Sequence, residues 1–200
     1  QADARDGADV GGEAMAPASG PRTPGEEYTA WSPAGVRPLE ILDRAGTDPE
    51  AKKVLVEVAT TICHVEAPIA RRRLYVKISR AFGLSRTVKS REESIRAALG
   101  EAFAYFDEDG FVWTSREAAL AAPTYRCNAL DHVDSIQEIH PRELVGLMAQ
   151  ARARNPEWAS REDLFTWALK RLSAKNRSLG ARGVSEALTR ALEEAEREQS

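Results

Sequence analysis

The side chains with the clearest chemical potential in this sequence are basic. The stretch Arg71–Arg91 reads RRRLYVKISRAFGLSRTVKSR, and from Arg71 to Arg96 nine bases are accompanied by two acids, a local net charge of 9 − 2 = +7. The whole chain carries a formal net charge of −3. Lysine and arginine at this density neutralise phosphates, so a nucleic acid is one explanation. A solvated face balanced by acids elsewhere in the fold is the other.

Three of these bases follow a helical spacing. Arg73, Lys77 and Arg80 recur at i, i+4 and i+7, so we expect them to share an exposed helix face that points away from Leu74. Nothing acidic lies within that helix, and a bound polyanion would relieve their repulsion. The following turn and the next helix contribute more candidates. The residues predicted to contact nucleic acid are Arg73, Lys77, Arg80, Arg86, Lys89, Arg91, Ser94 and Arg96.

No catalytic constellation is visible in the sequence. His64, His132 and His140 lie far apart and lack the spacing of a metal site. Cys63 follows Ile62 on an apolar stripe, where packing is a better interpretation than reactivity. The glycine pairs lack the lysine and the strand of a phosphate-binding loop. We therefore expect this segment to have no enzymatic activity, metal or cofactor of its own.

Length and composition favour a cytoplasmic globular protein. The chain has 200 residues, of which 42% are hydrophobic and 30% charged, as in soluble helix-rich domains. It contains neither an apolar run of about 20 residues nor a signal peptide, so no membrane partner is expected. Cys63 and Cys127 form no CxxC pair, which favours a reducing compartment. Because the sequence begins with Gln1, we expect a piece of a longer protein.

The first 48 residues differ from the rest. They hold nine acids and four bases, a net charge of −5, while residues 49–200 hold 22 acids and 24 bases, a net charge of +2. Residues 1–38 are rich in Gly, Ala, Pro and Asp and show no periodicity. We expect residues 1–48 to form a flexible acidic arm, whose end Tyr28 and Trp31 attach to the domain.

Residues 49–122 are predicted to form a winged-helix-like unit. A first helix begins at Asp48-Pro49, an N-cap followed by proline at the first helical position. A second helix spans about residues 69–82, and the capping-box pattern Ser90–Glu93 predicts the start of a third, which carries Phe103 and Phe106 inward. An Asp-Gly turn between Tyr105 and Trp113 then predicts a β-hairpin. Three helices followed by a hairpin is the order of a winged helix.

In winged helices the helix after the turn often enters the major groove, while the hairpin touches the DNA backbone or the minor groove. The tip of this hairpin is acidic at Asp107, Glu108 and Asp109, and these side chains would repel phosphates. Two alternatives follow: the hairpin points away from the DNA, or the unit binds protein.

Residues 123–200 are predicted to form a second helical, winged-helix-like unit. His140-Pro141 opens one helix, Ser160–Asp163 caps another, and the last spans about residues 182–197. Leu74 and Phe82 are matched by Leu164 and Leu172 at an offset of 90 residues, and a similar match follows at 89, which favours an internal duplication. The predicted fold is therefore mostly α, with tandem winged-helix-like units behind a disordered arm.

Several short motifs resemble a known family. They are Glu66-Ala-Pro-Ile-Ala70, Ala81-Phe-Gly-Leu-Ser-Arg86, the helix from Ser90 onward, and Ile139-His-Pro-Arg-Glu-Leu144. Over about residues 49–192 the chain resembles a bacterial domain-of-unknown-function family found at the C-terminus of large superfamily 1 helicase-like proteins that also carry a Vsr-like restriction endonuclease domain. Ala67 and Ala70 replace the family's usual Gly and His, so no role of that His transfers to this chain.

The resemblance implies an accessory module of a nucleic-acid-remodelling protein, such as one used in phage defence or restriction. With the basic cluster, it favours binding of double-stranded DNA, or positioning of a substrate, beside helicase and nuclease domains upstream in the same protein. A protein-interaction module that docks onto the ATPase or another partner is the alternative. The two differ in salt dependence, because DNA binding weakens linearly in a log–log plot against salt.

Overall fold

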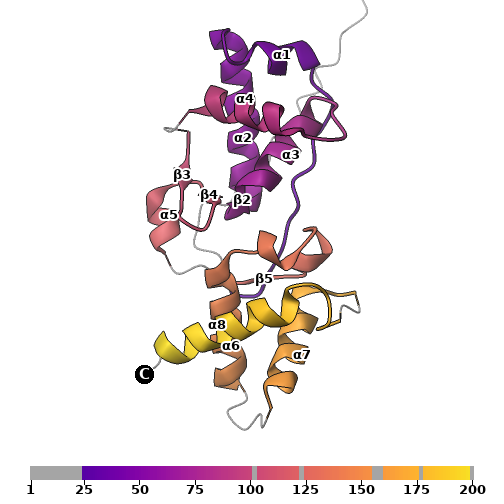
Figure 1. Ribbon diagram of the computed structural model, residues 1–200. Helices are drawn as coiled ribbons and strands as arrows, with labels where there is room; N and C mark the ends of the chain where they lie inside the picture. Colours follow the sequence, from indigo (N-terminus) through magenta and orange to yellow (C-terminus); the bar gives the residue numbers. More distant parts are fainter. Residues whose placement is uncertain (1–23, 101–102, 122–123, 155–159, 176–177, 199–200) are drawn as a thin grey trace, which may run out of the picture.

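The computed structural model describes residues 24–100, 103–121, 124–154, 160–175 and 178–198. Within these ranges the chain is mostly helical, with eight α-helices and a few very short strands (Figure 1). The elements of the first half are β1 Glu26–Glu27, α1 Leu39–Arg44, α2 Pro49–Glu66, β2 Ile69–Ala70, α3 Arg71–Ala81, α4 Lys89–Leu99, β3 Tyr105–Phe106, β4 Phe111–Trp113 and α5 Arg116–Leu120. Those of the second half are β5 Arg126–Cys127, 3₁₀ turns at Ala129–Asp131 and Ile136–Glu138, α6 Pro141–Arg154, α7 Arg161–Leu172 and α8 Val184–Glu198.

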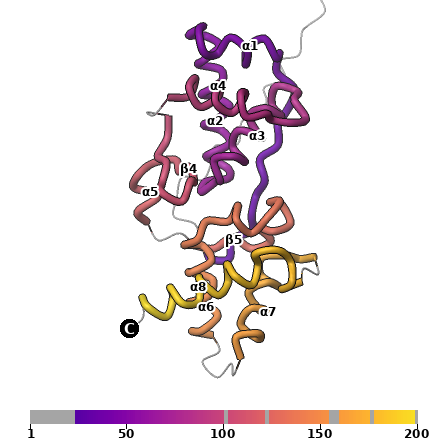
Figure 2. Tube along the Cα trace, viewed as in Figure 1, coloured from indigo at the N-terminus to yellow at the C-terminus, as the bar shows by residue number. Residues whose placement is uncertain are grey.

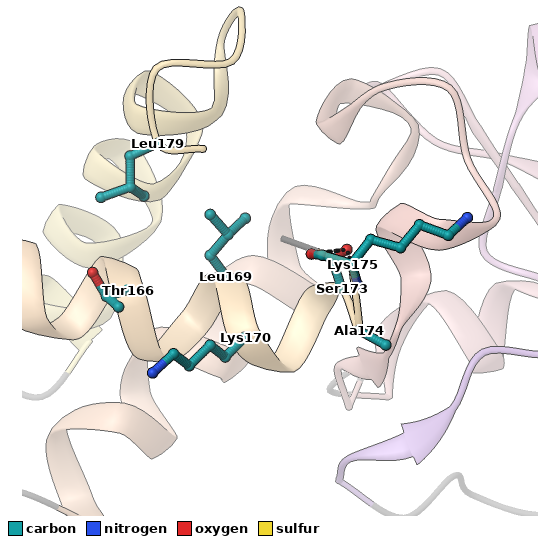
Figure 3. Close-up of a pocket in the computed structure, with 7 residues that line it drawn as sticks. All are labelled: Thr166, Leu169, Lys170, Ser173, Ala174, Lys175 and Leu179. Carbon is teal, nitrogen blue, oxygen red and sulfur yellow. Dashed lines mark hydrogen bonds between the residues drawn. The ribbon is translucent and has the colours of Figure 1, made fainter. Parts of the chain in front are cut away.

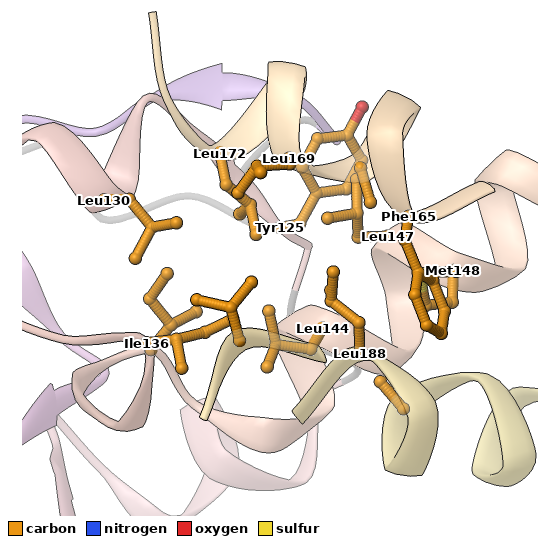
Figure 4. Packing of buried hydrophobic residues seen from close by; sticks show 14 of the residues in the cluster. Tyr125, Leu130, Ile136, Leu144, Leu147, Met148, Phe165, Leu169, Leu172 and Leu188 are labelled. Atoms are coloured by element: carbon orange, nitrogen blue, oxygen red, sulfur yellow. The ribbon is translucent and has the colours of Figure 1, made fainter. Parts of the chain in front are cut away.

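The buried apolar side chains form two separate cores. The first lies among α1 to α4 and is built on residues such as Leu55, Leu74 and Ile95. The second lies among α6, α7 and α8, where Leu147 and Leu188 are fully buried (Figure 4). The chain trace passes from the first half to the second through the segment around β5 (Figure 2). Each half therefore has the apolar interior that an independent packing unit needs.

The first half begins as the sequence predicts. The Asp48 carboxylate accepts the backbone N–H groups of Glu50 and Ala51, and Pro49 occupies the first helical position of α2. The Asp-Gly hairpin also forms, with β3 and β4 antiparallel and Phe106 opposite Val112. Strand β2 adds to the other side of β4, which gives the antiparallel order β2-β4-β3. The hairpin is thereby fixed to the start of α3.

The capping box predicted for α4 is wrong. The helix begins at Lys89 with Val88 as its N-cap, and no side chain caps it. Ser90 lies inside the first turn, where its carbonyl oxygen accepts the Ser94 hydroxyl. The helix also ends earlier than predicted, because Gly100 adopts φ +72° immediately after Leu99. Phe106, predicted on the inner face of this helix, instead lies in β3.

Residues 24–48 do not form the flexible arm that is expected for residues 1–48. Residues 1–23 lie outside the described part of the chain. Strand β1 pairs in parallel with β5 of the second half. The Tyr28 side chain is buried between the two halves, and α1 contributes buried Leu42 to the first core. Apolar anchors spaced along a polar segment are enough to hold it, even though it has no periodicity of its own.

The second half contains a helix at the position that the predicted repeat requires. Pro141 opens α6, and the Ser160 hydroxyl accepts the Asp163 N–H at the start of α7, as predicted. An offset of 90 residues places the α3 range at 161–171, and α7 is Arg161–Leu172. The matched residues Leu164 and Leu172 are buried like their counterparts. Among the described helices, none combines the length and apolarity that a bilayer-crossing segment needs.

Leu99→Ala should lower the free energy of unfolding by about 2–5 kcal/mol, because the Leu99 side chain is only 5% exposed and packs in the first core. Leu120→Ala is the matched control, since Leu120 is 69% exposed and should change stability by less than about 0.5 kcal/mol. Urea denaturation followed by circular dichroism measures both. Equal effects of the two variants would contradict the placement of α4.

Candidate nucleic-acid interface

Two of the predicted contact residues are not on the surface. Arg73 and Lys77 are 8% and 7% exposed, so the prediction that they share an exposed face with Arg80 is wrong. Arg73 Nε donates to Glu66 Oε2 at 2.9 Å, and Lys77 Nζ lies 2.6 Å from Glu66 Oε1. Lys77 also donates to the carbonyl oxygen of Trp31 at 2.6 Å. Their positive charges are therefore balanced inside the protein.

The Glu66 carboxylate is the centre of this arrangement and is fully buried. Besides the two cations, it accepts the Tyr28 hydroxyl at 2.6 Å and the Trp31 N–H at 2.7 Å. Burial alone would raise the pKa of Glu66, but the hydrogen bonds from Lys77, Tyr28 and Arg73 outweigh it and hold the pKa below its ordinary value. Glu66 is thus a charged carboxylate that ties the first core to the segment before α1.

The remaining predicted residues lie on the outside. Arg80, Arg86, Lys89, Ser94 and Arg96 are exposed, on α3, the following turn and α4. In the described part of the chain, no carboxylate lies within 4 Å of the four cations in this set. The Ser94 hydroxyl donates to its own helix and keeps its lone pairs as acceptors.

Arg91 is an intermediate case. Its guanidinium pairs with Asp43 of α1, and its side chain is 27% exposed. This pair attaches the start of α4 to α1, so Arg91 carries less free charge than the sequence predicts.

Two further arginines belong to the same surface. Arg72 is exposed and lies two helical turns before Arg80 on α3, on the narrow stripe that is not packed. The Arg71 guanidinium lies 5.2 Å from the ring centroid of Phe106, beside the hairpin. The i, i+8 spacing of Arg72 and Arg80 is the sequence signal for this stripe. It identifies the stripe only once Glu66 is known to pair with Arg73 and Lys77.

The acidic hairpin tip faces the second half of the protein. Asp107 accepts the Phe111 N–H at 2.8 Å and the Trp113 indole N–H at 2.5 Å. His140 Nε2 lies 2.9 Å from Asp107 Oδ2, while His140 Nδ1 accepts the Arg142 N–H. The bond to Nδ1 places the ring proton on Nε2, which therefore donates to Asp107. Asp107 is held between the halves, and His140 is a buried cap of α6.

A second buried charge cluster, absent from the sequence prediction, joins the two halves at Arg126. The Arg126 guanidinium is bidentate to Glu143, at 2.6 and 2.8 Å. It also donates to the carbonyl oxygens of Glu66 at 2.7 Å and Pro68 at 3.0 Å in the first half. Tyr28 stacks on it, with the guanidinium carbon 4.6 Å from the ring centroid. The relative placement of the halves is thus fixed by oriented polar contacts.

No group of three His, Cys, Asp or Glu side chains in the part of the chain that the structure describes could hold a metal ion. Burial raises the pKa of Cys63 to about 12, so its thiol is protonated near neutral pH. The chemistry that remains on the surface is that of unpaired cations. Comparison with protein-family models, curated proteins and solved structures gives no significant match to this chain.

Proposed function

We propose that this chain is a non-catalytic module that binds double-stranded DNA through α3, α4 and the turn between them. The observation that carries the proposal is the group of exposed cations in this region that lack a carboxylate partner among the described residues: Arg72, Arg80, Arg86, Lys89 and Arg96. Cations without internal partners are free to neutralise phosphates, and each contact releases counterions from the duplex.

The topology of the first half supports a winged-helix-like interpretation. The order α2-β2-α3-α4-β3-β4, with an antiparallel sheet in the order β2-β4-β3, corresponds to the helices, strands and hairpin of that fold. In this proposal α4 approaches the duplex. The hairpin tip does not, because Asp107 is already bonded to His140. This contact holds Asp107 away from the phosphate backbone, while Glu108 and Asp109 remain exposed at the tip.

The wider role that we propose is positioning of DNA for helicase and nuclease domains in the same protein. The family resemblance of the helix and turn motifs is the support for it. A module of this kind needs affinity for phosphates and a fixed orientation, and it needs no reactive group of its own.

A second candidate function is docking onto an acidic protein surface. Two exposed apolar residues near the basic turn favour it: Val88 is 61% exposed at the start of α4, and Val36 is 72% exposed. Val36 packs close to Gly83, which follows α3. Apolar side chains among cations are more typical of a protein interface than of a surface that binds only phosphates.

The combined variant Arg80→Ala, Arg86→Ala and Lys89→Ala tests the DNA proposal. It should weaken binding to duplexes of every sequence and make the slope of log affinity against log salt shallower by up to about 3, since each phosphate contributes about 0.9. Fluorescence anisotropy with a labelled duplex across a salt series measures both quantities, and circular dichroism checks folding.

The matched control removes three other exposed cations, Lys53, Arg116 and Arg154, which lie on α2, α5 and α6. It should leave the salt slope nearly unchanged. If the unaltered chain binds no duplex at low salt, or the control variant loses as much as the test variant, the DNA proposal is wrong. Salt-sensitive capture of an acidic protein would then support docking.

A further inference from the structure

The second half contains a basic segment that corresponds to the one in the first. Residues 67–91 hold eight bases and no acid, and residues 164–185 hold five bases and no acid. Each segment covers the equivalent of one helix, the turn after it and the approach to the next helix, namely α3 to α4 and α7 to α8. Two acid-free runs of this length in a chain of net charge −3 need an explanation.

The two segments also agree in which residues they expose. Leu164 and Leu172 are buried at the positions of Leu74 and Phe82, 90 residues apart. At the same offset, Lys170 corresponds to Arg80, and both are exposed. The apolar positions of the repeat therefore serve the two cores, while a cation is kept on the outer face of both helices.

The cations of the second segment are available for a ligand. Lys170, Lys175 and Arg182 are exposed, and in the described part of the chain no carboxylate lies within 4 Å of them. Asp131 is the acid that interacts electrostatically with Lys175. Its carboxylate is used to hold the turn, because it accepts the Ser173 hydroxyl at 2.6 Å and the Ala174 N–H at 2.7 Å.

The arrangement of these cations suits an extended polyanion better than a small anion. A cavity of about 280 Å³ lies beside α7, lined in part by Lys170, Ser173 and Lys175. Figure 3 shows the two ammonium groups pointing away from each other, so they do not converge on this cavity. A single phosphate could not be bound by both, whereas separate phosphates of one nucleic-acid strand could.

In the view of Figure 1, the segment that follows α3 and the segment that follows α7 both extend to the right, one from each half. The halves are joined by Arg126, which is 2% exposed, and by the buried Tyr28. A fixed relative orientation of two cationic turns is what simultaneous contact with one duplex requires.

We infer that Lys170, Lys175 and Arg182 form a second duplex-binding surface, so that the chain contacts two stretches of one DNA molecule. This inference rests on the proposed function and extends it, because it sets a minimum length for the partner. A duplex that is too short to contact both basic turns of the protein neutralises only one of the two sets of cations.

The test compares duplexes of about one and about three helical turns. On the longer duplex the salt slope of the unaltered chain should be steeper by about 2 to 3, since three more phosphates are neutralised. The variant Lys170→Ala, Lys175→Ala and Arg182→Ala should show the same slope on both lengths and lose about tenfold or more in affinity for the longer one. Its affinity for the shorter duplex should remain.

Two further variants make the outcome specific. Lys170→Arg with Lys175→Arg keeps the charges and should keep the length-dependent slope, while the Lys53, Arg116 and Arg154 control should also keep it. If the unaltered chain binds DNA through Arg80, Arg86 and Lys89 but shows equal slopes on both lengths, the second surface is refuted and the proposed function stands. Absence of duplex binding at low salt, by contrast, refutes both.

Discussion

Glu66→Ala should lower the free energy of unfolding by about 3–5 kcal/mol, the usual cost of removing one partner from a buried ion pair. Arg73 and Lys77, 8% and 7% exposed, would lose the carboxylate that balances them, and Arg73 would retain only its longer pair with Glu138, at 3.5 Å. The Tyr28 hydroxyl and the Trp31 N–H would also lose their acceptor. Urea denaturation followed by circular dichroism measures the change.

Glu57→Ala is the matched control on the same helix. The Glu57 side chain is 66% exposed, and its ion pair with Arg37 is long, at 3.8 Å. Solvent screens such a pair, so the variant should lose less than about 1 kcal/mol. Similar losses in the two variants would mean that Glu66 does not organise the buried cluster.

The same carboxylate should make the protein sensitive to acid. The ordinary pKa of a glutamate in an unfolded chain is about 4.3. In the folded protein the pKa of Glu66 lies below that value. Its contribution to stability is therefore complete above the unfolded-state pKa and is lost as the pH falls through the folded-state pKa. As the pH falls below the unfolded-state pKa, the unaltered chain should approach the stability of Glu66→Gln, and a difference between them that does not change with pH would contradict the ion-pair assignment.

The elements of this fold could be predicted from the sequence where local chemistry determines them. Three such signals act within a few residues of the chain. Asp48-Pro49 starts α2, the Asp-Gly turn forms the β3–β4 hairpin, and Ser160 starts α7, as their patterns indicate. Ser90 fails because a capping box describes only possible bonds. At this site Val88 is the N-cap, and Ser90 lies two residues beyond it, inside the first turn.

The candidate site could be predicted only in part. The density of positive charge predicts a basic surface, and Arg80, Arg86, Lys89 and Arg96 are exposed. The periodicity of α3 could not separate Arg73 and Lys77 from them, because their partner Glu66 belongs to the preceding helix. An acid just outside a basic helix can neutralise one face of it, and only the tertiary packing decides which face.

The connection between the halves could not be predicted for a similar reason. Arg126 and Glu143 are of residue types that are mostly exposed, and the sequence predicts Tyr28 as an anchor without indicating its partners. They are buried because they satisfy one another and the carbonyl oxygens at the end of α2. Such a cluster has no period that a sequence pattern could reveal.

Arg126→Ala should separate the unfolding of the two halves and cost about 3–5 kcal/mol. Arg126 is 2% exposed and Glu143 is fully buried, so truncation would leave a buried carboxylate without its cation. The carbonyl oxygens of Glu66 and Pro68 would lose donors, and both of these bonds cross from one half to the other. Each half keeps its own apolar core, so each could unfold separately.

Differential scanning calorimetry gives the decisive measurement. The unaltered chain should unfold in one transition, and Arg126→Ala in two, with the first at a lower temperature. Arg126→Lys keeps the charge but lacks the planar guanidinium that reaches Glu143 and both carbonyl groups. Its unfolding should therefore be intermediate between that of the unaltered chain and that of Arg126→Ala. Arg116→Ala, which removes an exposed arginine of α5, should retain the single transition. If Arg126→Ala also unfolds in one transition at an unchanged temperature, the halves are held together by other contacts, and the fixed alignment of the two basic turns loses its structural basis.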